Sequence, residues 1–565
     1  MYNVRLYFHW YYLRDFKMKK IFILLMLILT TGDYVSAQFF GRQPDFNRQD
    51  TLRGTITAER SWWDVTYYHL DVKVNLEDST FSGTNVIQYR VDSITTNLMQ
   101  VDLQEPMEIS EVTQSGKALS FRREGNAFFV ETSSEPTIGE INEVVVHFSG
   151  KPKKAVRAPW DGGISWTRDK NGNPFVASSN QGIGASIWWP NKDHAYDEPD
   201  SMLISITVRD DLMNVSNGRL KKETDNNDGT KTWHWFVSNP INNYGVNINI
   251  GDYVHFEEVF EGEKGDLDVD YYVLSYNLEK AIKQFADAPR TLEAFEYWFG
   301  PYPFYEDSYK LVEAPYLGME HQSSVTYGNG YENGYLGRDL SSTGWGMKFD
   351  FIIIHESGHE WFANNITYKD VADMWIHESF TNYSESLFLE YHYGEKAGNE
   401  YVIGTRLAIQ NDRPIIGIYD VNYEGSSDMY YKGGNMLHTI RQVIGDDELW
   451  REILRGLNKE FYHQTVTTEQ IENYMIKKSG KDLKSVFDQY LRDYRVPILE
   501  YYFRDNNMVY RWNNSVPNFD MPVKVNVDGK QMILQPKTRW QAIPSSGKDL
   551  QVDINYYVGS FKVQK

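Results

Sequence analysis

The sequence predicts a multidomain α+β protein with an all-β N-terminal domain, a mixed α/β middle domain and a small C-terminal β module. The chain has 565 residues, which is too many for one ordinary hydrophobic core. Residues 62–257 form short runs in which apolar and polar residues alternate, separated by turn sequences, a pattern typical of strands. After about residue 276 the apolar residues recur at helical spacing, and from Pro497 onward the strand pattern returns.

These patterns also set the expected boundaries. We expect a signal peptide at 1–37, a lead-in at 38–61, the β domain at 62–257, the mixed domain at 258–495 and the C-terminal module at 496–565. In the mixed domain we expect helices over 278–299 (interrupted near Pro289), 348–367, 377–393 and 429–444, and short strands over 309–312 and 323–327. Ser427 or Asp428 can cap the helix over 429–444, Gly445 fits its C-terminal end, and Thr467 with Gln470 forms a capping box for a further helix.

The N-terminal segment has the features of an export signal. A basic start follows Met18, residues 21–29 are nine consecutive apolar residues, and small residues precede a cleavage point near Ala37. Met18 begins a better-formed signal than Met1 does. We therefore expect a periplasmic or secreted protein without a stable membrane span, because nine apolar residues are too few to cross a bilayer.

Charge and cysteine content exclude several kinds of function. The formal charge is −21, and removing the predicted signal peptide, which has five basic and two acidic residues, leaves −24. Such a surface repels phosphate backbones and anionic lipids, which argues against nucleic-acid binding and membrane-surface roles. The chain has no cysteine, so disulfides, thiol nucleophiles and cysteine zinc sites are ruled out. A metal site must therefore use His, Asp and Glu.

One short motif has the spacing of a metal site. The pattern His-Glu-x-x-His stands at residues 355–359 in a stretch expected to be helical. Positions i and i+4 share one helix face, so His355 and His359 can reach the same ion. Glu356 lies beside that face, where it can contact a water molecule on the metal.

The third ligand is expected from the next helix. Glu378 follows His359 after eighteen intervening residues, enough for the chain to turn and return antiparallel. Two His and one carboxylate with an open fourth position form the usual catalytic zinc arrangement, so we expect one zinc ion per chain. Zinc lowers the pKa of a bound water to about 7, and Glu356 is the expected general base.

Attack on a carbonyl creates an oxyanion that needs a stabilising group besides zinc. Tyr430 is our candidate. It precedes Gly433 and Gly434, which each cost roughly 1 kcal/mol relative to Ala inside a helix and therefore indicate close packing there.

With these motifs the chain resembles the aminopeptidase N family of zinc metallopeptidases (gluzincins), which includes the leukotriene hydrolases. That family has His-Glu-x-x-His, eighteen residues and Glu, as this chain has from His355 to Glu378. Its Trp-Phe-Gly-Asn resembles residues 361–364, and its Tyr-x-Lys-Gly matches residues 430–433, which favours Tyr430 over Tyr431. The resemblance implies a β-saddle domain, a thermolysin-like catalytic domain and a small β-sandwich-like module.

The resemblance also implies a substrate-binding segment. The family's exopeptidase signature Gly-x-Met-Glu-Asn is similar to residues 317–321, where Gly318, Met319 and Glu320 precede His321. In the family this Glu binds the α-ammonium group of the substrate, and Glu320 is placed to do so. Two residues depart from the signature: Leu317 replaces its Gly, and His321 replaces its Asn, where a protonated ring would repel an ammonium group. Gln181 is a candidate for the family's upstream Gln.

These observations predict a zinc-dependent aminopeptidase that acts on peptides with free N-termini. Residues 496–565 are too few for the large helical C-terminal domain of many family members, so we expect a more open cleft. Two alternatives remain. The same site could serve an endopeptidase or an epoxide hydrolase, or the fold could serve as a non-enzymatic peptide-binding or adhesion protein.

Overall fold

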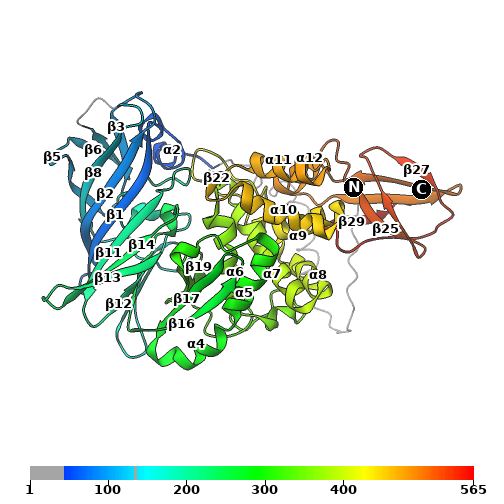
Figure 1. The fold of residues 1–565 in the computed structure, drawn as a ribbon. Helices are drawn as coiled ribbons and strands as arrows, with labels where there is room; N and C mark the ends of the chain where they lie inside the picture. The colour runs from blue at the N-terminus through cyan, green and yellow to red at the C-terminus, as the bar shows by residue number, and fades with distance from the viewer. Residues whose placement is uncertain (1–43, 133–136, 565) are drawn as a thin grey trace, which may run out of the picture. The chain divides into compact units, whose positions relative to one another are not determined.

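The computed structural model describes residues 44–132 and 137–564 (Figure 1). The predicted signal peptide at 1–37 lies outside the described residues. The described part of the predicted lead-in contains two short helices, α2 (Arg48–Gly54) and α3 (Ala58–Ser61). Arg60 is buried and pairs with Asp102 at 2.7 Å, so α3 is anchored on the β domain.

Alternating apolar and polar residues build the largest sheet of the N-terminal domain. In β1 (Trp63–Asn75), Leu70 and Val72 are buried while Asp71 and Lys73 are exposed. The sheet has the order β13-β14-β11-β1-β2-β8-β4-β5. Its other strands are β2 (Thr80–Val91), β4 (Glu108–Gln114), β5 (Lys117–Ala118), β8 (Ile141–Gly150), β11 (Ser201–Arg209), β13 (Arg219–Asp225) and β14 (Thr230–Val237).

Two smaller sheets complete this domain, in the orders β12-β15-β10-β9 and β3-β7-β6. Their strands are β3 (Leu98–Asp102), β6 (Phe121–Glu124), β7 (Ala127–Glu131), β9 (Gly163–Arg168), β10 (Pro174–Ser179), β12 (Met213–Val215) and β15 (Asn249–Gly251). The shared core is rich in large aromatic side chains, including the buried Trp63, Trp188 and Trp235. The prediction of an all-β N-terminal domain is confirmed.

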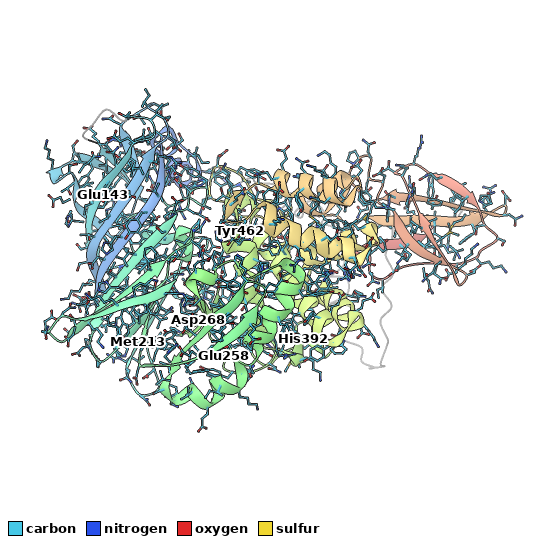
Figure 2. The ribbon with its side chains drawn as sticks, in the orientation of Figure 1. Glu143, Met213, Glu258, Asp268, His392 and Tyr462 are labelled. Atoms are coloured by element: carbon cyan, nitrogen blue, oxygen red, sulfur yellow. The ribbon has the colours of Figure 1, made fainter. Side chains whose placement is uncertain are left out.

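The middle domain begins with a five-stranded sheet of order β16-β17-β18-β20-β19. Its strands are β16 (Tyr253–Gly262), β17 (Gly265–Leu274), β18 (Tyr309–Glu313), β19 (Gly318–Met319) and β20 (Val325–Tyr327). Figure 2 labels Glu258 on β16 and Asp268 on β17. Because β16 pairs with β17 along its whole length from Tyr253, the sheet begins five residues before the predicted start of this domain at residue 258. At the other edge, the short β19 pairs only with β20.

Helices form most of the rest of the middle domain (Figure 1). They are α4 (Leu278–Gln284), α5 (Asp287–Phe299), α6 (Phe351–Gly358), α7 (Trp375–Tyr393), α8 (Glu395–Gly404), α9 (Tyr431–Ile444), α10 (Asp447–Glu460), α11 (Thr468–Ser479) and α12 (Lys484–Leu491). The expected helix at 278–299 is split between α4 and α5, just before Pro289. The capping box of Thr467 and Gln470 is present at α11, and Gly445 ends α9 in the left-handed conformation.

Two helix predictions need correction. The helix expected over 348–367 ends near His359, because Phe362 and Ala363 have non-helical backbone angles and the chain enters β21 (Ile366–Tyr368), which pairs with β22 (Gln464–Val466). The helix expected from 429 begins at Tyr431. A 3-10 turn precedes it, and Ser426 rather than Ser427 or Asp428 caps that turn.

The C-terminal module consists of strands, as predicted. One sheet has the order β27-β24-β23-β29 and the other β26-β25-β28. The strands are β23 (Ile498–Arg504), β24 (Asn507–Asn513), β25 (Val523–Val527), β26 (Lys530–Leu534), β27 (Gln541–Pro544), β28 (Leu550–Val552) and β29 (Gly559–Lys562). Among the described residues, no helix has the length and apolar character needed to cross a membrane.

The close contact of α9 with α7 yields a test of stability. A Cβ added at Gly433 would lie 2.7 Å from Ser379 Cβ, well inside normal contact distance. We therefore expect Gly433→Ala to lower the free energy of unfolding by about 1–3 kcal/mol, seen as an earlier transition in denaturant. Gly245→Ala is the control, because its Cβ would come no closer than 3.9 Å to a neighbouring atom. Equal stability of the two variants would contradict the packing argument.

Candidate metal centre

A buried cap fixes the start of α6, the helix that carries both candidate His ligands. Asp350 accepts hydrogen bonds from Ile352 N and Ile353 N, and its other oxygen accepts one from Tyr327 OH at 2.8 Å. Burial raises the pKa of the Asp350 carboxyl to about 6 despite these donors. The apolar residues that follow Asp350 pack into the core, so the opposite face of α6 is set toward α7.

The three predicted ligands converge between α6 and α7. The distance from Glu378 Oε2 to His355 Nε2 is 3.8 Å, and to His359 Nε2 it is 3.5 Å. All three side chains are buried, and one ligand atom of each lies within 4.8 Å of the others. The structure thus brings together the three residues that the sequence pattern selected.

The second nitrogen of each imidazole is occupied by another group. His355 Nδ1 lies 2.9 Å from Glu385 Oε1, and His359 Nδ1 lies 3.1 Å from the carbonyl oxygen of Phe362. The non-helical backbone at Phe362 turns that carbonyl back toward the His359 ring. The early end of α6 therefore supplies the group that orients this imidazole. Protonated at Nδ1, each ring presents the lone pair of Nε2 toward Glu378.

These residues fit a zinc ion. Glu378 Oε2 is buried and has no hydrogen-bond partner, whereas Oε1 accepts a bond from Gln181 Nε2 at 3.1 Å. Ligand atoms that each lie about 2.0–2.2 Å from one tetrahedral ion are separated by about 3.4 Å. The observed separations of 3.5 and 3.8 Å are close to that value. The sequence offered Gln181 only as a candidate for the family's upstream Gln. Its hydrogen bond to Glu378 places it directly beside the expected metal-binding carboxylate.

Glu385 is a functional residue that the sequence reasoning missed. Besides His355, it accepts hydrogen bonds from Asn382 Nδ2 at 3.2 Å and from Tyr401 OH at 2.7 Å. It follows Glu378 by seven residues on α7, and two helical turns place both carboxylates on the same face. That spacing was a usable signal, since the ring nitrogen of a metal-binding His that faces away from the ion commonly bonds a carboxylate.

Glu356 lies next to the ligand trio on α6. Burial is the main cause that raises the pKa of its carboxyl to about 7, and Glu378 raises it further while His355 acts in the opposite direction. Across from it, a Cβ at Gly318 would lie 2.6 Å from Glu356 Oε1 and 2.8 Å from Ile352 Cγ2. Only glycine at this point of the edge strand β19 leaves room for the carboxylate.

Tyr430 lies at the junction between the 3-10 turn and α9. Its ring stacks near that of His355, with centroids 6.1 Å apart and planes at 24°. Burial, followed by the charge of Glu378, raises the pKa of its hydroxyl well above the usual value, so it remains protonated. Ser379 Oγ donates to Met429 O at 2.7 Å, which fixes this junction on α7. Tyr431 also lines the cleft.

Glu320 follows the edge strand β19. Its Oε1 is buried without a hydrogen-bond partner, and Asn364 Nδ2 holds its backbone carbonyl at 3.0 Å. One atom each of Glu320, Glu356 and His359 lies within 4.8 Å of the others. Burial, followed by the charges of Glu378 and Glu356, raises the pKa of Glu320 well above the usual value. A cation bound here would pair with the buried Oε1 and would offset the repulsion between Glu320 and the neighbouring carboxylates.

The prediction that His321 belongs to the substrate-binding segment, where its protonated ring would repel an ammonium group, is wrong. Gly318, Met319 and Glu320 line the cleft, but His321 does not. Its ring is fully buried, with Nδ1 at 2.8 Å from Thr326 Oγ1. Burial lowers its pKa to about 3, so the ring is neutral at pH 7 and repels no ammonium group.

A cleft of about 700 Å³ contains the ligand trio. Its lining residues lie between Pro159 and Tyr431, and within the described ranges none comes from the C-terminal module. The fold and site together define a chain with a thermolysin-like His₂Glu metal centre beside an edge strand.

Residues 65–244 match the peptidase M1 N-terminal domain, and residues 284–490 match the peptidase family M1 domain. The chain belongs to peptidase family M1. Similar relatives include probable aminopeptidase 1 of Sulfurisphaera tokodaii, 22% identical over 83% of this chain and 59% of the relative, and aminopeptidase N of Lactococcus lactis, 23% identical over 78% and 52%. The chain thus spans between one half and three fifths of these relatives.

Solved structures share the fold. The M1 zinc metallopeptidase of Deinococcus radiodurans aligns with a TM-score of 0.66 at 19% identity, covering 78% of this chain and 95% of that one. A mutant of that enzyme bound to a Tyr-Ser-Ala substrate aligns with a TM-score of 0.65 at 18% identity, over 77% and 95%.

The bond between His355 and Glu385 yields a prediction about metal affinity. We expect Glu385→Gln to weaken zinc binding roughly 10- to 100-fold, because the amide is a poorer partner for the Nδ1 proton. Competition with a chromogenic chelator measures this. Glu395→Gln, at an exposed position on α8, should bind zinc as the unaltered protein does. Unchanged affinity in Glu385→Gln would contradict the role given to Glu385.

Proposed function

We propose that this protein is a zinc-dependent aminopeptidase that removes N-terminal residues from peptides. The observation that carries the proposal is the buried, unpartnered Oε1 of Glu320, which lies in the same cleft as the ligand trio. A buried carboxylate beside other carboxylates favours a cationic partner. The α-ammonium group of a peptide supplies that charge at a fixed distance from its first peptide bond.

His355, His359 and Glu378 would hold the zinc ion, which when bound acidifies water and polarises a carbonyl group. Glu356 is placed beside the ligands to take the proton of the attacking water and to pass it to the leaving amine. A pKa of about 7 suits both steps. Tyr430, which keeps its proton, donates a hydrogen bond to the oxyanion.

The edge strand β19 supports the proposal that the site binds an extended peptide. Its outer side faces the cleft, so the backbone of a substrate can pair with it as an added strand. Glu320 stands at the end of this strand and stops the substrate at its N-terminus. An endopeptidase would need that end of the cleft to be free of such an anchor.

We also propose that the protein is exported and acts in the periplasm or outside the cell after cleavage near Ala37. The basic start after Met18, the apolar residues 21–29 and the small residues before the cleavage point support this proposal. The absence of cysteine is compatible with an oxidising compartment.

A comparison of blocked and unblocked substrates tests the proposed activity. An aminoacyl p-nitroanilide should be cleaved, its N-acetylated form should show at most a small residual rate, and a chelator should abolish turnover until zinc is restored. Equal cleavage of the blocked compound would favour an endopeptidase instead. If neither is cleaved by zinc-loaded protein, the non-enzymatic alternative gains support.

Glu356→Gln should retain zinc but lose roughly 10²- to 10⁴-fold in kcat, because the amide cannot accept the proton.

Tyr430→Phe should lose roughly 10²- to 10³-fold in kcat with KM little changed, because its hydroxyl acts in the transition state. Steady-state kinetics and zinc content measure both. A near-normal kcat in zinc-loaded Glu356→Gln would contradict the role of Glu356 as general base. A near-normal kcat in zinc-loaded Tyr430→Phe would contradict the role of Tyr430 as donor to the oxyanion.

Glu320→Gln tests the anchor. We expect KM for an unblocked anilide to rise roughly 10- to 100-fold, since a charge-assisted hydrogen bond contributes about 1.5–3 kcal/mol. The residual cleavage of N-acetylated substrate should not fall in parallel. Equal losses for both substrates would show that Glu320 supports the site without binding the ammonium group.

A further inference from the structure

Three loops that line the cleft together with Glu320 contact one another. A Cβ at Gly162 would lie 3.0 Å from Ile183 Cβ, so the loop at 156–162 packs on residues 181–183. Asn422 Nδ2 donates to Gly182 O at 3.2 Å, which joins the loop at 422–424 to the same residues. Because Gln181 contacts Glu378, this junction lies beside the metal centre. Because these loops line the same cleft as Glu320, the side chain of a substrate's first residue can enter the cleft between them.

The first loop presents an exposed tryptophan to the cleft. Trp160 is 69% exposed and is the only tryptophan among the exposed large apolar side chains of the described ranges. Its loop is nevertheless well fixed. Asp161 accepts hydrogen bonds from Val156 N and Arg157 N, both at 2.9 Å, and Gly162 N donates to Pro159 O at 3.0 Å. An exposed indole carried on such a loop at the cleft is suited to receive a side chain.

The third loop presents a carboxylate without a partner. Glu424 lines the cleft, and within residues 44–132 and 137–564 no group forms a hydrogen bond or an ion pair with it. The side chain is exposed to the cleft. Partial desolvation there raises the pKa of Glu424, and the charge of Glu378 raises it further. A cationic ligand beside Glu424 would offset the cost of holding this carboxylate charged.

One positive charge lies nearby. Arg413 is the only Lys or Arg that lines the cleft in the described structure, and it lowers the pKa of Glu424. Its guanidinium donates instead to Gly425 O at 2.9 Å and lies 3.5 Å from Tyr423 OH. Arg413 thus leaves the Glu424 carboxylate available.

We propose that Trp160 and Glu424 form the pocket for the side chain of the N-terminal residue and that this pocket selects Arg or Lys. The proposal rests on the aminopeptidase function. The aliphatic part of Arg or Lys packs on the indole, and its charged end pairs with the carboxylate. A neutral residue keeps only the first contact, and an acidic residue is repelled by Glu424.

Neutral analogues, of which citrulline is isosteric with arginine, separate charge recognition from shape. We would measure kcat/KM for p-nitroanilides of arginine, citrulline, lysine, norleucine and leucine. For the zinc-loaded protein we expect about a tenfold preference for arginine over citrulline and for lysine over norleucine. Glu424→Gln should abolish that preference and leave citrulline and leucine within about twofold. Trp160→Ala should reduce cleavage of arginine, citrulline and leucine anilides together, by about threefold or more.

Glu452→Gln is the matched control, because it removes an exposed carboxylate on α10 away from the cleft. It should keep the full preference, which separates a local contact from the general acidic field. Competitive inhibition of the unaltered protein by free L-arginine and by L-citrulline gives a second measurement that needs no variant. Arginine should bind about tenfold more tightly.

A preference for citrulline or leucine over arginine in the unaltered protein would contradict the proposal that this pocket selects Arg or Lys. So would equal losses for all five substrates in Glu424→Gln, or loss of the preference in Glu452→Gln. Unchanged kinetics in Trp160→Ala would remove the indole from it. Failure of the aminopeptidase function gives a different result, namely no zinc-dependent cleavage of any unblocked anilide.

Discussion

Several ionisable groups are buried around one small space between α6 and α7, and the rest of the site depends on that constraint. Glu320, Glu356 and Glu378 lie there with His355 and His359, and all are almost fully removed from water. Burying an isolated carboxylate costs several kcal/mol even after relaxation. Such a group of side chains is stable only with compensating positive charge, which a zinc ion and a substrate ammonium group together would supply.

The surrounding structure fixes these side chains from outside. Glu385 and the carbonyl of Phe362 orient the two imidazoles, while Asp350 fixes the rotation of α6. The glycine at position 433 lets α9 approach α7 closely enough to place Tyr430 against His355. The site is therefore produced by helix contacts rather than by one motif, and the local breaks in helix geometry at Phe362 and Tyr430 are part of it.

Sequence periodicity was sufficient for the parts of the site that share one helix or one well-known spacing. His355, Glu356, His359 and Glu378 follow from helical geometry and chain length. The contact of Gln181 with Glu378 joins residues 197 positions apart, so no local pattern could establish it. The neutral state of His321 depends on burial by segments distant in sequence. The end of α6 was also missed, because tertiary hydrogen bonds, from Thr381 Oγ1 to the Phe362 carbonyl and from Asn364 Nδ2 to the Glu320 carbonyl, override the helical pattern.

Metal stoichiometry tests the central claim most directly. After equilibrium dialysis against zinc, mass spectrometry of the metal content should give one zinc ion per chain for the unaltered protein and essentially none for Glu378→Ala, with both proteins folded by circular dichroism. A folded protein that takes up no zinc would contradict the account. So would a Glu378→Ala variant that keeps a full equivalent of the metal.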